Sequence, residues 1–121
     1  MLKKVKEDFS FSDERGCLVQ LVHEGFTQIN VLKSCKGSYR GGHYHKVAKE
    51  RFYVVEGTVD VTLYPVGDPQ ACERYTFADG DMFEIDPCVV HSMAFPIECT
   101  MVAMYDVGVE HLDGVKDIYK P

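Results

Sequence analysis

Residues 37–57 read GSYRGGHYHKVAKERFYVVEG, and this stretch determines how the rest of the chain is interpreted. His43 and His45 stand two residues apart, so on an extended strand both imidazoles project from the same face. Glu50 opens the next strand-like run and shares its face of that run with Phe52 and other apolar side chains. A carboxylate directed into an apolar interior is costly without a partner, and a metal ion is one such partner.

The second half of this stretch continues into a β-hairpin. Residues 51–63 read RFYVVEGTVDVTL, in which two β-rich runs flank Gly57. Glycine provides the positive φ that a tight turn requires. After the turn, Val59, Val61 and Leu63 alternate with polar residues, which predicts one buried and one exposed face.

The rest of the chain also has the pattern of short strands separated by turns, and no segment keeps a 3.6-residue period long enough to predict a helix. This pattern predicts an all-β barrel or sandwich. The strand candidates are Cys17–His23, Phe26–Lys33, Glu50–Glu56, Thr58–Leu63, Glu73–Phe77, Met82–Ile85, Val90–Phe95 and Thr100–Val107.

We expect one domain over residues 1–121, because this length fits a single core. Its core should run from about 17–107, preceded by an N-terminal arm (1–16) and followed by a C-terminal tail (108–121). The tail could form a last helical turn or an arm that covers a neighbour.

Composition excludes several classes of protein. The net charge of −6 argues against nonspecific nucleic-acid binding, which needs a basic surface. No apolar run approaches the ~20 residues needed to span a bilayer, so we expect no membrane association. Five cysteines, an odd number without a C-x-x-C pair, favour reduced thiols. With no signal peptide recognisable at the N-terminus, these features predict a cytoplasmic protein.

A third histidine completes the candidate metal site. His91 follows a turn at Asp79-Gly80-Asp81 and lies on a strand candidate whose same-face neighbours are Met93 and Phe95, so it should also point inward. Three imidazoles and a carboxylate suit Zn, Mn, Fe, Ni or Co without selecting one of them. We therefore expect one divalent transition metal ion at four ligands, which are His43, His45, Glu50 and His91.

These residues resemble the two motifs of the cupin superfamily. Residues 37–57 fit the first motif, G-x5-H-x-H-x(3,4)-E-x6-G, at every fixed position. The second motif, G-x5-P-x-G-x2-H-x3-N, is matched by the separation of Gly80 and His91, but Cys88 stands where glycine is usual and Phe95 where asparagine is usual. The resemblance implies a single cupin-type β-barrel, a double-stranded β-helix or jelly roll that is usually dimeric.

A narrower resemblance points to cupins that modify sugar nucleotides. The segments DERG at 13–16 and RGGHYHK at 40–46 are similar to motifs of deoxysugar 3,5-epimerases, of sugar-nucleotide 3,4-ketoisomerases and of the C-terminal cupin of capsular polysaccharide assembling proteins. In the epimerases, the histidine that matches His43 is the catalytic base. The ligand set is closest to that of the last group, and these motifs do not choose among the three.

Three functions follow from these residues. The first is a nucleotide-sugar isomerase or epimerase of polysaccharide biosynthesis, in which His43 removes a proton next to a carbonyl and Tyr105 or Tyr53 returns one. The second is a metal-dependent dioxygenase with the same ligands. The third is a non-catalytic cupin that binds a small ligand. His43 cannot serve at once as metal ligand and as free base.

The predicted substrate is a nucleotide sugar, and four residues are its candidate contacts. The Arg40 guanidinium suits a diphosphate, with Lys46 nearby, while Phe52 and Phe95 would form an apolar wall for the sugar ring. A homodimer is the expected assembly, with Val5–Phe11 as an arm across the partner.

Overall fold

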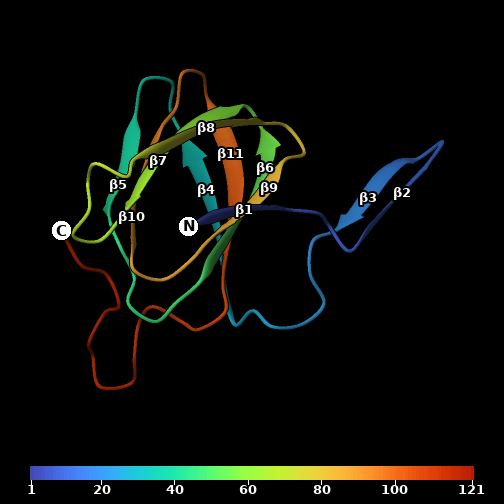
Figure 1. Cartoon of the computed structure of the whole chain (residues 1–121). Helices are drawn as coiled ribbons and strands as arrows, with labels where there is room; N and C mark the ends of the chain where they lie inside the picture. Colours follow the sequence, from blue (N-terminus) through green and yellow to red (C-terminus); the bar gives the residue numbers. More distant parts are fainter.

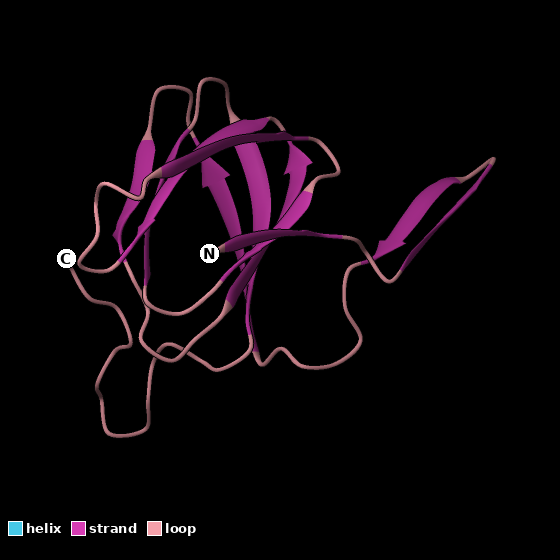
Figure 2. Cartoon of the chain, in the orientation of Figure 1, coloured by secondary structure: helices cyan, strands magenta, loops and turns pink.

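The computed structural model describes all 121 residues, Met1–Pro121, and every regular element in it is a strand (Figures 1 and 2). No helix is present that is long and apolar enough to cross a membrane. The strands, in chain order, are β1 (Leu2–Val5), β2 (Phe9–Asp13), β3 (Gly16–Gln20), β4 (Gln28–Ser34), β5 (Tyr39–His43), β6 (Glu50–Glu56), β7 (Thr58–Pro65), β8 (Glu73–Ala78), β9 (Met82–Ile85), β10 (Val89–Ala94) and β11 (Cys99–Tyr105).

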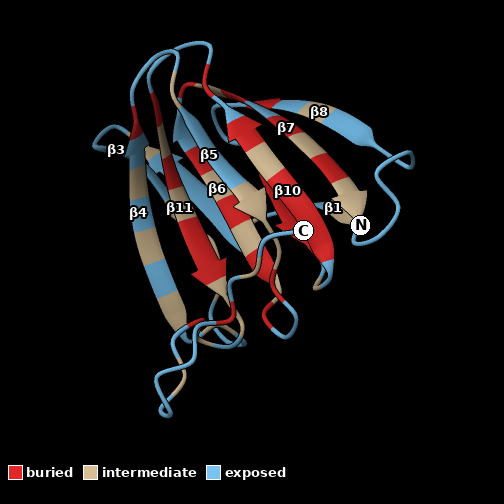
Figure 3. Ribbon diagram, turned by 90° about the vertical axis from the view of Figure 1, so that its left-hand side faces the viewer, coloured by how far each residue is buried: buried red, intermediate tan, exposed pale blue.

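Two antiparallel sheets form the barrel. One has the strand order β1-β9-β6-β11-β4 and the other β5-β10-β7-β8, so neighbours in space are mostly distant in sequence. Buried residues alternate with less buried ones along β6 and β7, whereas β9 is buried throughout (Figure 3). The predicted all-β barrel is therefore confirmed.

The core is built from alternate residues of both sheets. Phe52 and Val54 of β6 and Phe83 of β9 face Val61 and Leu63 of β7, all 2% exposed or less. Each such side chain stabilises the fold by roughly 1.5–3 kcal/mol relative to an exposed one. This packing holds the two sheets in a fixed relation, which in turn fixes the groups at the open end of the barrel.

The predicted hairpin between β6 and β7 is present. Gly57 has φ 110°, and a Cβ atom there would collide with the Glu98 carbonyl oxygen. Only glycine therefore fits the turn. Val59, Val61 and Leu63 are buried as the alternation predicts.

The N-terminal region differs from the expected arm. Leu2–Val5 forms β1, which pairs with β9 as an edge strand of the five-stranded sheet, so the core begins at Leu2 rather than near residue 17. The next two strands, β2 and β3, pair only with each other and project from the barrel as a hairpin (Figure 1). The strands β1, β2 and β5 were not predicted, because none of them contains a buried residue that would mark an inner face.

The C-terminal tail does not form the helical turn that was one of the two structures considered for it. It folds back on its own chain, where Tyr119 pairs with Tyr44 and Lys116 pairs with Glu110 through isolated bridges. It therefore lies against the loop that follows β5.

Candidate active site

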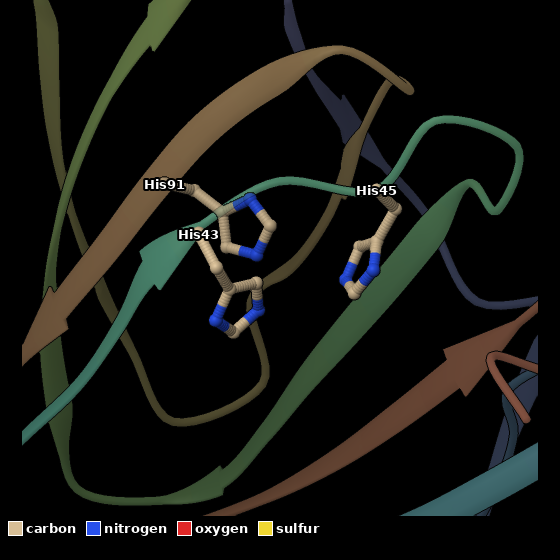
Figure 4. A group of neighbouring side chains, drawn as sticks. All are labelled: His43, His45 and His91. Carbon is tan, nitrogen blue, oxygen red and sulfur yellow. The ribbon is translucent and has the colours of Figure 1, made fainter. Parts of the chain in front are cut away.

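Three imidazoles converge inside the barrel. His43 ends β5, His45 lies two residues further along, and His91 lies on β10, and the rings point toward one another (Figure 4). The ring centroids are separated by 5.1 Å for His43–His45, 4.9 Å for His43–His91 and 5.5 Å for His45–His91. One ring nitrogen of each lies within 4.8 Å of the others. The predicted convergence of these three residues is confirmed.

A β-bulge on β5 directs Arg40 and His43, which are three residues apart, to the same face of the strand. Arg40 pairs with Met93, and His43 pairs with His91, while the register shifts by one residue between them. The extra residue lies in the Gly41-Gly42 pair, where both φ angles are positive, at 97° and 76°. Bulges of this kind re-aim side chains next to functional sites. Arg40 and His43 therefore both face the interior, which a regular strand does not allow for residues three apart.

Glu50 completes the cluster from the start of β6. Its Oε1 lies 3.1 Å from Nε2 of His45 and 3.4 Å from Nε2 of His91. The residue is 3% exposed. Burial alone would raise the pKa of Glu50, but hydrogen bonds with His45 and His91 hold it at about 2. Glu50 is therefore a buried carboxylate that stays ionised because the two imidazoles support its charge.

The Nδ1 atoms of His45 and His91 are hydrogen-bonded to backbone carbonyls. Nδ1 of His45 lies 2.5 Å from the Asp117 carbonyl oxygen, and Nδ1 of His91 lies 3.0 Å from that of Val89. A carbonyl oxygen only accepts hydrogen bonds, so each Nδ1 carries a proton. Both Nε2 atoms then face Glu50, where an unprotonated nitrogen would repel the carboxylate. The arrangement requires a proton or a shared cation between these groups.

These hydrogen bonds change the pKa of His45. Burial on its own would lower the pKa of His45, but hydrogen bonds with the Glu50 carboxylate and the Asp117 carbonyl outweigh burial and raise it. A metal ion would take the place of the proton, because two Nε2 lone pairs, the Glu50 oxygen and His43 form a donor set suited to a divalent transition metal. The three histidines thus fit such an ion, and the Glu50 carboxylate lies beside two of them as the fourth candidate ligand.

His43 differs from the other two histidines because its imidazole makes no hydrogen bond within the protein. Burial, followed by the nearby His91 and His45, lowers the pKa of His43 to about 4. The ring is therefore neutral at pH 7 and keeps a free lone pair. It also lines the cavity, so a bound molecule can reach it.

The cavity above the histidines has a volume of about 390 Å³. Tyr105 lines it from β11, with its ring edge-on to His45 at a centroid distance of 5.8 Å. Burial, and then the charge of Glu50, raises the pKa of Tyr105 far above its ordinary value of 10.0. Arg40 lines the mouth, where its guanidinium donates to Ser34 Oγ at 2.8 Å and to the Lys33 carbonyl at 3.2 Å.

Three predicted site residues lie elsewhere. Tyr53 pairs with Val102 on the outer face of the sheet, since it alternates with the inward Phe52, so its assignment as proton donor is wrong. Lys46 stacks its ammonium on the Tyr119 ring at 4.1 Å, outside the cavity. Phe95 is 1% exposed and belongs to the core, so of the two aromatic wall residues only Phe52 lines the cavity.

Sequence reasoning missed further cavity residues. Leu32 of β4 and Tyr39 of β5 line the mouth beside Arg40, and Met93 of β10 lines the wall. Met93 was expected only as an inward neighbour of His91, and Tyr39 lies on β5, which was not among the expected strands. Leu32 gives no local signal, because only the pairing of β4 with β11 brings it to the site.

The turn before His91 explains the departure from the second motif. Cys88, which stands where glycine is usual, has φ 62°. Residues other than glycine adopt this left-handed backbone conformation only at a cost in free energy. Its backbone N–H donates to the His45 carbonyl at 2.6 Å. This contact ties the turn to the His45 loop.

Residues 11–106 match the model of the polysaccharide biosynthesis C-terminal domain. The chain belongs to this family. No curated protein matches the sequence. The match extends from the projecting hairpin to the end of β11, so it includes every side chain that lines the cavity of this polysaccharide biosynthesis domain.

Three solved structures, from the three groups that the sequence resembles, share the fold. The sugar 3,4-ketoisomerase QdtA of Thermoanaerobacterium thermosaccharolyticum, crystallised with TDP, has 18% identity and a TM-score of 0.79 over 99% of this chain and 88% of its own. The dTDP-4-dehydrorhamnose 3,5-epimerase of Sulfolobus tokodaii has 15% identity and a TM-score of 0.67 over 86% and 74%. CapF has 19% identity and a TM-score of 0.70 over 93% and 33%. These similarities confirm the cupin-type fold.

Proposed function

We propose that this protein is an isomerase or epimerase of a nucleotide-activated keto sugar, acting by proton transfer next to a carbonyl. The observation that carries the proposal is the state of His43, which is neutral, without a hydrogen-bond partner and directed into the cavity. A general base must reach its proton and must be unprotonated at working pH. The family to which the chain belongs and the folds of the ketoisomerases and epimerases support this assignment.

In this mechanism His43 removes the ring proton next to the carbonyl of the bound sugar, and the imidazolium, which is partly open to solvent, exchanges this proton with water. For isomerisation the imidazolium then protonates the former carbonyl carbon, while the hydroxyl proton of the neighbouring carbon passes to the carbonyl oxygen. For epimerisation a second group delivers a proton to the opposite face, and exchange with water restores both groups. Tyr105 keeps its proton at any physiological pH and donates a hydrogen bond to the oxygen on which charge develops. Glu50 and His45 hold the polar floor of the cavity in place. The cycle needs no further reactant, because the product is an isomer of the substrate.

The substrate proposal rests on the cavity mouth. Arg40 is anchored by Ser34 and Lys33 but keeps free N–H groups, which suit a diphosphate. Phe52 gives the sugar an apolar face to lie against. QdtA was crystallised with TDP and, as a variant, with TDP-4-keto-6-deoxyglucose, so TDP-linked keto sugars are the first compounds to test.

A calorimetric or thermal-shift screen of TDP- and UDP-sugars against the free sugars tests this proposal. Nucleotide sugars should bind and free sugars should not, and Arg40→Ala should weaken binding by about 1.5–3 kcal/mol, the range for hydrogen bonds to charged groups. Equal binding of free sugars would show that the diphosphate contact is wrong. If neither class binds, the sugar assignment fails.

We also propose that His43, His45, Glu50 and His91 can hold one divalent transition metal ion. Bound there, the ion would supply Lewis-acid chemistry, polarising a substrate carbonyl. It would also occupy the lone pair of His43 that the proton transfer needs. Activity that falls as metal is added therefore assigns His43 as base, whereas activity that requires metal assigns it as ligand.

The convergence of three imidazoles within 4.8 Å favours one second function, a metal-dependent dioxygenase. Such enzymes need open coordination positions for O₂ and substrate, which the cavity beside the cluster can provide. Oxygen consumption by the protein loaded with ferrous iron separates this function from the first.

The proposed partner is a second copy of this chain. The β2–β3 hairpin presents Phe9, Phe11 and Leu18 on one face, each at least half exposed, and pairs with no other strand. A two-stranded hairpin is marginally stable alone. The outer face of the five-stranded sheet exposes Ile29 and Val31. In a two-fold dimer, the hairpin of each copy would cover this sheet face of the other.

A further inference from the structure

The loop between His45 and Glu50 has no strand partner. Residues 46–49 present four consecutive backbone N–H groups, and all four are accepted by carboxylates that follow β11 in the chain. Asp106 accepts the hydrogen bond of Lys49 at 2.7 Å. Asp117 accepts the other three.

Asp117 lies far from this loop in sequence but is buried against it, with 1% of the residue exposed. One carboxylate oxygen accepts from Lys46 N–H at 2.7 Å, and the other accepts from Val47 at 3.0 Å and from Ala48 at 2.8 Å. Three donors on one carboxylate fix both the position of the loop and the direction of its peptide planes. A buried carboxylate is stable here because these N–H groups replace its water.

The same residue also contacts the site directly. The backbone carbonyl of Asp117 accepts the Nδ1–H of His45 at 2.5 Å, which fixes the tautomer and directs Nε2 to Glu50. The tail is held to the loop on the other side by two backbone hydrogen bonds between Tyr44 and Tyr119, at 2.9 Å and 3.0 Å. The Asp117 side chain therefore fixes the position of the loop, and the Asp117 carbonyl fixes the orientation of the His45 ring.

We propose that Asp117 is the positioning residue of the active site, holding His45 in the tautomer and orientation that the cluster uses. The inference rests on the proposed function only for what His45 then does. Asp117 lies beyond residues 11–106, the part of the chain that matches the family. The C-terminal tail therefore completes the site from outside the region that the family model covers.

Asp117→Asn tests the proposal, with Asp113→Asn as the matched control. Asp113 is an exposed carboxylate of the same tail, and its side chain accepts only from Val115 N–H. The first readout is the 15N NMR spectrum of the imidazoles in metal-free protein at pH 9. We expect Nδ1 of His45 to be protonated in the wild type and in the control, because it donates to the Asp117 carbonyl, and to lose this proton in part in Asp117→Asn. His91, held by Val89 on β10, is the internal reference and should not change.

The second readout is the affinity for Co²⁺, followed by its visible absorption. Residues that orient a ligand typically change metal affinity by about 10–100-fold, and we expect a loss of that size in Asp117→Asn alone. If the wild type binds no Co²⁺, the metal proposal fails while the NMR experiment still tests Asp117. An unchanged His45 tautomer in Asp117→Asn overturns the inference. If that variant does not fold, the same NMR measurement on Tyr119→Pro, which removes one donor that holds the tail, decides the question.

Discussion

His43 and His91 lie directly opposite each other on β5 and β10, with ring centroids 4.9 Å apart. This pairing depends on the bulge that follows Arg40. A Cβ atom at Gly41 would lie 2.6 Å from the His91 carbonyl oxygen, and φ is 97° there. The relation between the two histidines is therefore built into the backbone of a single strand pair.

We predict that Gly41→Ala destabilises the protein by about 2 kcal/mol or more, because it adds a backbone clash to an unfavourable φ. Gly67→Ala is the matched control, since φ is 84° there but no atom lies within 4 Å of the added methyl group. Urea denaturation of both variants measures the difference. Equal destabilisation of the two would show that the close approach to His91 is unimportant.

The metal site gives the second prediction. The protein should bind close to one transition metal ion per chain, and His45→Ala or His91→Ala should abolish binding, because each removes an Nε2 that faces Glu50. Elemental analysis after dialysis against metal-free buffer measures the content. Chelation should also lower the melting temperature, since a ligand that binds only the folded state stabilises it. His23→Ala, a histidine outside the cluster, should retain full metal content, and retention in a His45/His91 double variant would disprove the site.

The projecting hairpin leads to a third prediction. Phe9→Ser with Phe11→Ser should shift the protein from dimer to monomer, because both side chains belong to the apolar face proposed to cover the partner. Leu112→Ser, at a fully exposed position of the tail, is the control and should remain dimeric. Sedimentation velocity at micromolar concentration measures the state. A wild type that sediments only as a monomer would contradict the proposed dimer.

The fourth prediction concerns pH. In the metal-free protein the pKa of His43 is about 4, below the 6.5 of the unfolded chain, so the unfolded state binds more protons between these values. Stability should therefore decrease as pH falls from 6.5 to 4.5. Discounted for partial exposure to solvent, the loss is on the order of 1 kcal/mol.

The other groups with shifted pKa values do not reverse the predicted decrease in stability at low pH. The raised pKa of His45 gives a contribution that is complete below pH 6.5, and the contribution of Glu50, whose pKa is about 2, is retained above 4.5. Denaturation at pH 7, 5.5 and 4.5 measures the slope. His43→Asn should flatten the profile, and an equally steep decrease in that variant would mean that another group is responsible.

The sequence predicted those parts of the site that depend on local spacing. His43 and His45 were expected to share a face because side chains alternate along a strand, and both rings enter the cluster although β5 ends at His43. Glu50 starts a run whose inward side is apolar. The same rule applied to Tyr53 would have placed it outside, since it is three residues from Glu50. Tyr53 was assigned as a proton donor because of its residue type, without regard to its outward position in the strand alternation.

The remaining parts depend on contacts between distant segments. The Gly41-Gly42 bulge determines that Arg40 faces inward, and a bulge is not visible from residue spacing alone. Asp117 is an unremarkable acidic residue in the sequence, and only the return of the tail to the loop after β5 gives it a role. β1 was missed because its two central residues are exposed lysines, so no apolar alternation marks it.

Solvent deuterium exchange tests the central claim most directly. The protein is incubated with TDP-4-keto-6-deoxyglucose in D₂O, and the ring proton next to the carbonyl is followed by 1H NMR. Wild-type protein should replace this proton with deuterium, and His43→Asn should reduce the rate by about 10²–10⁴-fold, the usual contribution of a general base. Tyr53→Phe, on the outer face, should exchange at the wild-type rate. Absence of exchange with this compound and with UDP-linked 4-keto sugars, or an undiminished rate in His43→Asn, would contradict the account.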